Sequence, residues 1–309
     1  MSKRGTENLA ASVRQRLLNI SRQQQEDFNL LLSRYAIERL LYRLTRSPFA
    51  EQFILKGAAL FAVWTGKHHR PTYDLDLLGY GDGSRATLTT IFGSICQVDV
   101  EADGLTFYPD SVRVQEIREG QVYSGQHVDM IAKLDTARIP VRIDIGFGDA
   151  VTPSPVLTDY PTLLTLPSPR LRTYPPETVI AEKLHAMVVL GMTNSRMKDF
   201  YDLWILARLF AFDGATLAKA IQATFERRQT VIPAVSPTAL TGEFATNVDK
   251  IKQWQAFLNR NRLNEGSVTF GEVIAALHHF LWPPLSALTT DQIFSATWPA
   301  GGPWRKDIG

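Results

Sequence analysis

The most constraining feature of the sequence is a short alternating segment, YDLDLL, at residues 73–78. Side chains of a β-strand point alternately to its two faces, so Asp74 and Asp76 share one face while Tyr73, Leu75 and Leu77 point into a core. Two adjacent carboxylates repel each other unless a cation lies between them, and Mg²⁺ prefers such oxygen ligands. The alternative is a solvated acidic strand end. The segment therefore predicts a buried strand that carries a candidate metal site.

The residues before this strand predict a phosphate site. Phe53-Ile54-Leu55 is a short expected strand, and Lys56-Gly57-Ala58-Ala59 opens a helix expected over residues 57–65. A glycine turn at a helix start presents free backbone N–H groups to an anion. A phosphate site beside paired carboxylates is typical of phosphoryl or nucleotidyl transfer.

A third carboxylate lies in a later apolar strand, expected over residues 138–147. Asp144 stands between Ile143 and Ile145, where an acid is costly unless it is paired or binds a metal. The alternative is that Asp144 lies on the exposed face of an edge strand, since Arg142 shares its face.

The chain of 309 residues is long enough for two domains. Five prolines mark an irregular stretch between residues 150 and 175, where we place the boundary. We expect an N-terminal domain at residues 1–160, with two helices and a mixed α/β core, and a helical domain at residues 161–309. The helices of the second domain are expected near residues 176–191, 197–210, 214–229, 243–261 and 269–281. The Gly- and Pro-rich tail from residue 295 is expected to be loosely ordered.

Two helical segments of the second domain carry charge among apolar residues. Lys183 lies among the apolar residues Ile180, Ala181 and Leu184, and a lysine there would neutralise a triphosphate. The alternative is a surface lysine whose aliphatic chain covers apolar residues while its charge reaches water. Asp199 and Asp202 share a helix face, where either would orient a basic group or the acceptor. The alternative for these two residues is a capped helix start with a surface ion pair.

Charge is distributed unevenly along the chain. The first 50 residues hold nine Lys or Arg and four acids, whereas residues 71–160 hold six basic and fourteen acidic residues. A basic start beside an acidic middle favours a protein that handles nucleic acid near a cation site, with the arginines of the first two helices on an RNA backbone; a solvated helix face is the alternative. The single Cys96 excludes an internal disulfide. No membrane-length apolar run or signal peptide is present, so we expect a cytoplasmic protein.

Taken together, four segments resemble the AbiEii-type nucleotidyltransferase toxins of type IV toxin–antitoxin and phage-defence (abortive infection) systems. They are the glycine turn with RPTYDLDL at residues 70–77, RIDIG at 142–146, EKLHA at 182–186, and RMKDFYDL at 196–203. This chain departs from many polymerase-β-like transferases at the turn, where Gly57-Ala58 replaces Gly-Gly or Gly-Ser. A hydroxyl for phosphate contact is thus absent, which bears on nucleotide affinity.

The resemblance implies an α+β protein, with a polymerase-β-like nucleotidyltransferase core on a mixed sheet and a helical C-terminal domain. It implies Mg²⁺-dependent transfer of nucleotides from an NTP to RNA, such as the 3′ end of tRNA, which blocks translation. It also implies a winged-helix antitoxin that often acts without stable binding. The implied catalytic residues are Asp74, Asp76, Asp144, Lys183 and Asp199; the first three bind metal, and the nucleotide is held by Gly57, Ala58, Arg70, Thr72, Lys183, Arg196 and Lys198. Two other hypotheses remain open: a transferase acting on a small molecule or protein hydroxyl, and an inactive nucleotide- or RNA-binding regulator.

Overall fold

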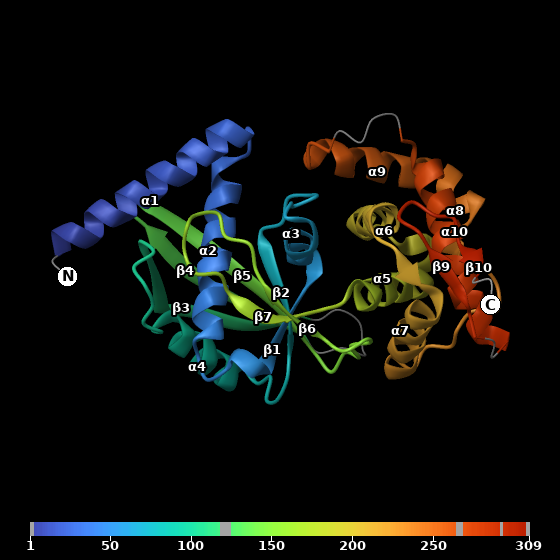
Figure 1. Ribbon diagram of the computed structural model, residues 1–309, viewed down its shortest axis with the longest axis horizontal. Helices are drawn as coiled ribbons and strands as arrows, with labels where there is room; N and C mark the ends of the chain where they lie inside the picture. Colours follow the sequence, from blue (N-terminus) through green and yellow to red (C-terminus); the bar gives the residue numbers. More distant parts are fainter. Residues whose placement is uncertain (1–2, 118–124, 264–267, 291–292, 307–309) are drawn as a thin grey trace. The chain divides into compact units, whose positions relative to one another are not determined.

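The computed structural model describes residues 3–117, 125–263, 268–290 and 293–306. The chain divides into two compact units (Figure 1). Unit 1 comprises Met1–Gly148 with Val156–Thr173, and unit 2 comprises Asp149–Pro155 with Tyr174–Gly309. The predicted α+β class, with a mixed sheet in the first part and mostly helices in the second, is confirmed.

Unit 1 is built on a seven-stranded sheet with the order β3-β4-β5-β2-β1-β7-β6. The pairs β2–β5 and β1–β7 are parallel and the others antiparallel, so the sheet is mixed. A single domain cut after residue 160 would separate β6 from β7, its antiparallel partner. The strands are β1 (Phe53–Lys56), β2 (Asp74–Gly79), β3 (Leu105–Ile117), β4 (Gly125–Leu134), β5 (Ala137–Phe147), β6 (Val156–Asp159) and β7 (Arg170–Thr173).

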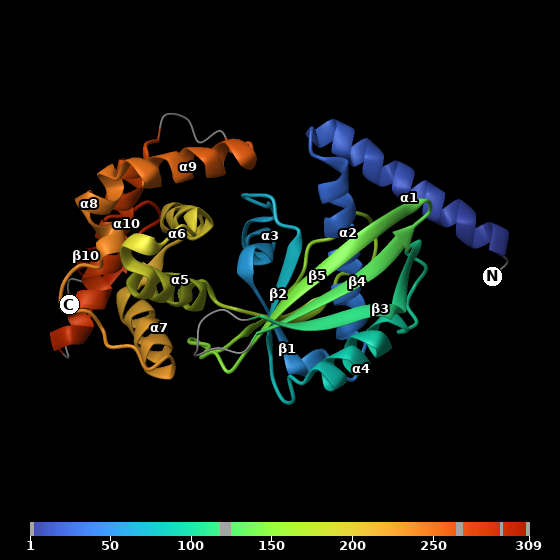
Figure 2. The ribbon, with the colours of Figure 1, turned by 180° about the vertical axis from the view of Figure 1, so that it is seen from behind.

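The helices of unit 1 are α1 (Lys3–Gln24), α2 (Phe28–Thr45), α3 (Leu60–Thr65) and α4 (Arg85–Cys96). Asp27 and Ser84 cap α2 and α4 by accepting hydrogen bonds from the backbone N–H groups of Leu30 and Thr87. Helix α2 lies in front of β4 and β5 in Figure 1, and these strands lie in front of α2 in Figure 2. One face of the sheet is therefore covered by α2, and the core forms there.

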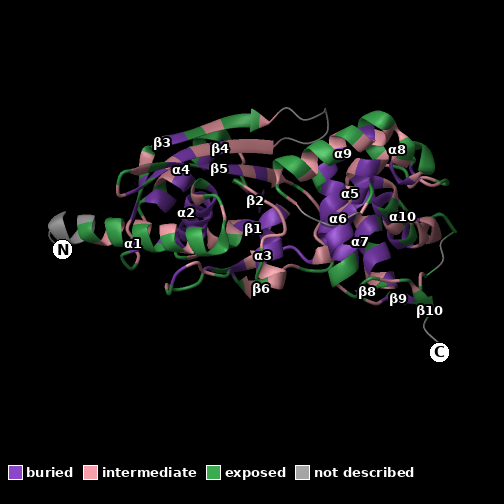
Figure 3. Ribbon diagram, turned by 90° about the horizontal axis from the view of Figure 1, so that it is seen from above, coloured by how far each residue is buried: buried purple, intermediate pink, exposed green. Residues whose placement is uncertain are grey.

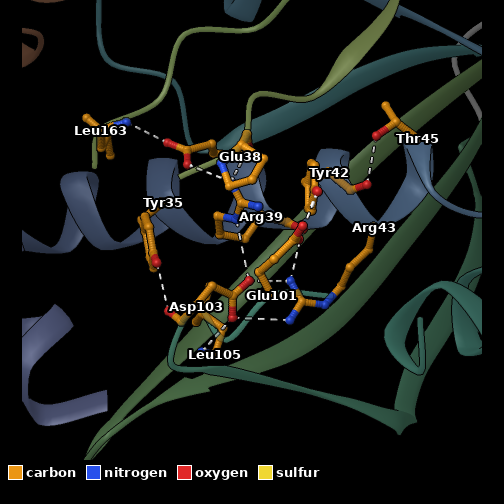
Figure 4. Close-up of polar contacts among 11 residues, drawn as sticks. Tyr35, Glu38, Arg39, Tyr42, Arg43, Thr45, Glu101, Asp103, Leu105 and Leu163 are labelled. Atoms are coloured by element: carbon orange, nitrogen blue, oxygen red, sulfur yellow. Dashed lines mark hydrogen bonds and ion pairs between the residues drawn. The ribbon is translucent and has the colours of Figure 1, made fainter. Parts of the chain in front are cut away.

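The arginines of α2 belong to this core and not to an RNA-binding surface (Figure 4). Arg39, Glu38 and Asp103 are 0%, 1% and 2% exposed, and Arg34 and Arg43 are also buried. The Arg43 guanidinium lies 2.6 Å from the Asp103 carboxylate, and Arg39 Nε lies 3.4 Å from it. The expectation that these arginines of α2 hold an RNA backbone is wrong, because their charges are used inside the protein.

The same cluster joins α2 to the segment between β6 and β7. Glu38 accepts a hydrogen bond of 2.7 Å from the backbone N–H of Leu163, and Arg39 donates one of 2.9 Å to the Pro167 carbonyl (Figure 4 shows Leu163). Burial raises the pKa of Glu38 to about 7, against the opposing effects of the Leu163 N–H and the Arg39 charge. These contacts explain why β6 and β7 belong to unit 1.

Unit 2 is mainly helical, and buried residues gather on α5, α6 and α7 (Figure 3). The expected helix over residues 243–261 is two helices, because Asn247 caps a new one by accepting from the N–H groups of Asp249 and Lys250. The elements are α5 (Pro176–Leu190), α6 (Met197–Leu209), β8 (Phe212–Asp213), α7 (Gly214–Arg227), α8 (Gly242–Thr246), α9 (Val248–Arg260), α10 (Phe270–Ala287), β9 (Ala296–Trp298) and β10 (Arg305–Lys306).

The C-terminal tail is ordered over its described residues, contrary to expectation. Strands β9 and β10 form a three-stranded sheet with β8. The Trp298 indole donates a hydrogen bond of 2.7 Å to the Ala207 carbonyl, and the Trp304 indole donates one of 2.9 Å to the Phe280 carbonyl. The tail contributes the buried Trp298 to the unit 2 core and packs the half-buried Trp304 against Phe280, which offsets the entropy of ordering its Gly-rich backbone.

Candidate active site

Strand β2 places Asp74 and Asp76 on one face of the sheet, as the alternation predicts. Leu75 and Leu77 are buried on the opposite face, while both aspartates are half-buried. Tyr73 lies before the first residue of β2 and is 49% exposed, so the expectation that it points into the core is wrong.

Strand β5 brings Asp144 beside this pair. In the parallel pairing of β2 with β5, Asp76 is opposite Asp144 and Asp74 is opposite Arg142. Strand β5 lies between β4 and β2 in the interior of the sheet, which excludes the edge-strand interpretation of Asp144. Cross-strand partners point to the same face, so Asp74, Asp76 and Asp144 lie on one face of the sheet although Asp144 is about 70 residues from the other two in sequence.

A histidine that sequence reasoning missed holds Asp144. His127 on β4 is opposite Asp144, and its Nδ1 lies 2.6 Å from the Asp144 carboxylate. Its Nε2 lies 3.3 Å from the Asp129 carboxylate. Burial lowers the pKa of His127, but its hydrogen bond to the Asp144 carboxylate and the charge of Asp129 outweigh this effect, so the pKa is raised. The only sequence signal was the alternation of His127 and Asp129 along β4, which does not show which strand is the neighbour.

The glycine turn is packed directly against Asp76. Gly57 has a φ of +73°, and a Cβ atom there would lie 1.9 Å from Asp76 Oδ2. Lys56 is opposite Asp76 in the antiparallel pairing of β1 with β2. The turn continues as a short 3₁₀ segment, Gly57–Ala59, before α3 begins at Leu60, instead of one helix from residue 57. Only glycine fits this left-handed position beside a carboxylate.

The two other predicted nucleotide contacts of unit 1 lie in the loop before β2. Thr72 Oγ1 donates a hydrogen bond of 3.2 Å to the carbonyl of Asp74, and Arg70 Nη1 lies 3.5 Å from the carbonyl of Pro71. Both side chains are half-buried. The observed role of Thr72 is thus to shape the entry into β2.

The oxygen donors of this site fit a hard divalent cation. Asp74 Oδ1 is buried and has no hydrogen-bond partner among the described residues, which a cation would supply. No three His, Cys, Asp or Glu side chains in the described part of the chain are gathered into a ready-made metal site, and the Asp144 carboxylate is directed to His127. Asp74 and Asp76 are therefore the candidate ligands of a cation, while His127 holds the nearby Asp144.

The remaining predicted site residues lie in unit 2, where Lys183 bridges two aspartates. Its Nζ lies 2.6 Å from Asp199 Oδ1 and 2.9 Å from Asp202 Oδ2. The side chains of Lys183 and Asp202 are 14% and 1% exposed, so neither a surface lysine nor a surface ion pair describes them. Arg196 Nε is 4.0 Å from Asp199 Oδ2, and Lys198 is exposed.

A comparison with protein families decides the assignment. The model of the family "Nucleotidyl transferase AbiEii toxin, Type IV TA system" matches residues 39–276, most of the chain. The chain belongs to the AbiEii family. This AbiEii protein is accordingly a nucleotidyltransferase toxin of a type IV toxin–antitoxin system, with an NTP as substrate and an antitoxin as partner. Enzymes of this class typically use a divalent metal.

Similar solved structures exist, although no curated protein matches this AbiEii chain. JHP933 from Helicobacter pylori has 14% sequence identity and a TM-score of 0.44, covering 82% of this chain and 87% of its own. A second H. pylori structure, named provisionally as a nucleotidyltransferase, has 15% identity and a TM-score of 0.43, covering 82% of this chain and 89% of its own. None of the described helices has the length and apolar character needed to cross a membrane.

Proposed function

We propose that this AbiEii protein transfers nucleotides from an NTP to an RNA acceptor, the 3′ end of tRNA, with Mg²⁺ as its cation, and so blocks translation. The observation that carries the proposal is the register of β2 and β5, which places Asp76 opposite Asp144 on the face that also carries Asp74. Half-buried carboxylates held together on one face of a sheet are typical of a catalytic site, because their mutual repulsion does not stabilise the fold.

The carboxylates of β2 hold the cation in this proposal. Asp74 and Asp76 supply hard oxygen ligands, and the buried Asp74 Oδ1, which has no hydrogen-bond partner among the described residues, fits that role. A Mg²⁺ ion held by these two aspartates would supply positive charge to the triphosphate and to the leaving group. The backbone of Gly57 and Ala58 cradles phosphate, and Arg70 and Thr72 border the nucleotide from the loop before β2.

Asp144 receives the proton of the acceptor hydroxyl. The hydroxyl oxygen attacks the α-phosphorus of the NTP, a new P–O bond forms, and the bond to the β-phosphate oxygen breaks, so that pyrophosphate leaves. His127 orients the Asp144 carboxylate through the 2.6 Å contact of Nδ1. A carboxylate held in this way is pre-organised for proton transfer.

Unit 2 supplies a second group of charged residues that the family resemblance links to catalysis. Lys183, Arg196 and Lys198 are candidates for phosphate contacts, and Asp199 orients Lys183 at 2.6 Å. Two buried carboxylates fix the ammonium group in one position, which is the usual way to aim a flexible lysine.

The proposal extends to the partner of the protein and to its place of action. We expect the antitoxin to be a winged-helix regulator that acts without a stable complex. The reaction takes place in the cytoplasm, where tRNA and NTPs are found.

The test is incubation of the purified protein with total bacterial RNA, Mg²⁺ and each labelled NTP in turn. Asp76→Asn removes one carboxylate charge at the site, and we expect it to abolish labelling while the protein stays folded. Asp99→Asn is the matched control, because Asp99 is an exposed acid of the same unit outside this site.

Label on tRNA-sized RNA with one NTP, lost in Asp76→Asn and kept in Asp99→Asn, would support the proposal and identify the donor. An active, folded Asp76→Asn protein would overturn the site. Absence of labelled RNA from folded, Mg²⁺-supplied protein would overturn the RNA acceptor, and labelling of a small molecule or protein would then identify the alternative transferase.

A further inference from the structure

The sheet face that carries the carboxylates extends well beyond them, across β5, β4 and β3. In the register of these strands, Arg142 is opposite Asp129, which is opposite Arg113. Farther along the same strands, Arg138 is opposite Lys133. Cross-strand partners and alternate residues of a strand share a face, so these side chains lie on the side of Asp144. We call this side of β3, β4 and β5 the outer face.

None of the helices that the structure describes in unit 1 covers the outer face. In Figure 2 the strands β3, β4 and β5 lie in front of α2, and no helix of unit 1 is drawn over them. Figure 3 shows exposed and intermediate residues along β3 and β4. Arg113, Lys133, Arg138 and Arg142 are all exposed, whereas their sequence neighbours Val112, Ala132, Ile139 and Val141 are buried on the other side.

The charge of this face is positive apart from the carboxylate site. The register places four basic side chains and one acid, Asp129, on this face beside the carboxylate site. Asp129 is already engaged, since its carboxylate lies 3.7 Å from Arg142 Nε and 3.3 Å from His127 Nε2. The remaining cations are thus available to a polyanion. The middle of the chain is acidic overall, so their concentration on one face is not explained by composition.

An aromatic side chain lies among these cations. Tyr108 is 41% exposed on β3 and is opposite Ile131 on β4. The register shifts between Tyr108 and Arg113, and Arg113 Nη1 is held by the carbonyls of Asp110 and Val112 in this irregular region. An exposed ring and a fixed guanidinium on a sheet are surfaces on which unpaired bases stack.

We propose that the outer face of β3–β5 binds the single-stranded RNA acceptor and leads its 3′ end to Asp144. Lys133, Arg138 and Arg113 contact phosphates, and Tyr108 stacks on a base. The inference rests on the proposed function, because it names where the acceptor of that reaction is bound. Charge complementarity selects RNA over a neutral or basic protein segment, and the exposed aromatic selects single strands over a duplex.

The test measures RNA binding separately from catalysis. Labelled single-stranded RNA is titrated against the Asp76→Asn protein at several salt concentrations and followed by fluorescence anisotropy. Lys133→Ala with Arg138→Ala is expected to reduce the slope of log affinity against log salt by about 1.4, at ~0.7 for each lost phosphate contact. Tyr108→Ala is expected to weaken binding on the order of tenfold.

The matched control is Arg85→Ala with Lys219→Ala, which removes the same charge from exposed positions off the outer face. The control protein with both substitutions is expected to bind RNA with the same affinity and salt dependence as the Asp76→Asn protein. In the active protein, Lys133→Ala with Arg138→Ala should raise the KM for RNA while kcat at saturating RNA is unchanged.

The outcomes separate this inference from the proposed function. Transfer to RNA that is indifferent to the outer-face variants, or equally impaired by the control pair, would overturn the binding surface and leave the transferase standing. Absence of RNA binding by the parent protein would overturn the binding surface as well. Tight RNA binding through the outer face without any transfer to RNA would uphold this surface and refute the proposed reaction.

Discussion

Replacing Gly57 with alanine should disable the active site while leaving most of the fold intact. The added Cβ would lie 1.9 Å from Asp76 Oδ2, 2.5 Å from its Cγ and 2.7 Å from its Cβ. A new rotamer of Asp76 moves the carboxylate but not its Cβ, which is fixed to the backbone of β2. The clash is therefore relieved only by a shift of the turn or of the strand that carries the catalytic pair.

The magnitude follows from the distances. A side-chain contact below 3.0 Å essentially does not occur, so the carboxylate oxygen must move by about 1.1 Å. A misplacement of about 1 Å at a reacting group costs roughly a hundredfold in rate, and we expect kcat for nucleotidyl transfer to fall by that factor or more. Because alanine is strained at this positive φ, the substitution should also lower the free energy of unfolding by about 1–2 kcal/mol.

Gly66 provides the matched control. It has a φ of +70°, and a Cβ atom added there meets nothing within 4 Å. Gly66→Ala should carry the same backbone cost, about 1–2 kcal/mol in urea denaturation, without the loss of kcat. A Gly57→Ala protein whose kcat stays within about threefold of that of Gly66→Ala would refute the argument that this turn must approach Asp76 so closely.

Three further results are expected. Lys183→Met should lower the free energy of unfolding by about 3–5 kcal/mol in urea denaturation, because two buried carboxylates lose their cation; the exposed Lys198→Met should change it little, and equal effects would contradict this account. His127→Asn should lower kcat roughly tenfold or more with the KM for NTP unchanged, and an unaltered kcat would show that His127 does not position the carboxylate it contacts. Burial, with the Arg228 charge, lowers the pKa of His185 from 6.5 to about 4, so the folded protein favours the neutral imidazole. The stability contributed by His185 is therefore fully present above pH 6.5, and roughly 3 kcal/mol of it is lost as the pH falls to 4. If the free energy of unfolding of the original protein does not fall relative to that of His185→Gln over this pH range, this account is contradicted.

Local sequence patterns were sufficient wherever a single element decides the outcome. The alternation at residues 74–77 predicted a strand with two aspartates on one face, and this is confirmed. Polar caps and proline punctuation placed most helices within a few residues, because capping and φ restriction act over one turn. The segment over residues 243–261 was the exception, since the Asn247 cap divides it into α8 and α9.

The charge of a side chain was the weakest predictor of whether that side chain is buried or exposed. The arginines of α2 lie off its apolar stripe in sequence, yet Arg39 and Arg43 are buried because Asp103, some sixty residues away, supplies the opposite charge. A buried cation is tolerated only beside such a partner, and the identity of that partner is a tertiary contact. The order of the tail also depends on tertiary contacts, since the indoles of Trp298 and Trp304 donate hydrogen bonds to the carbonyls of Ala207 and Phe280.

The sequence by itself determined the family, the α+β class and the identity of the acidic residues, because each is written in short segments whose chemistry is local. The tertiary structure alone decided that Asp144 faces Asp76, that His127 holds Asp144, and that cations from three strands share the outer face. The physical reason is strand register. A shift of one residue would turn every one of these side chains to the opposite face, and no local pattern specifies which strands become neighbours.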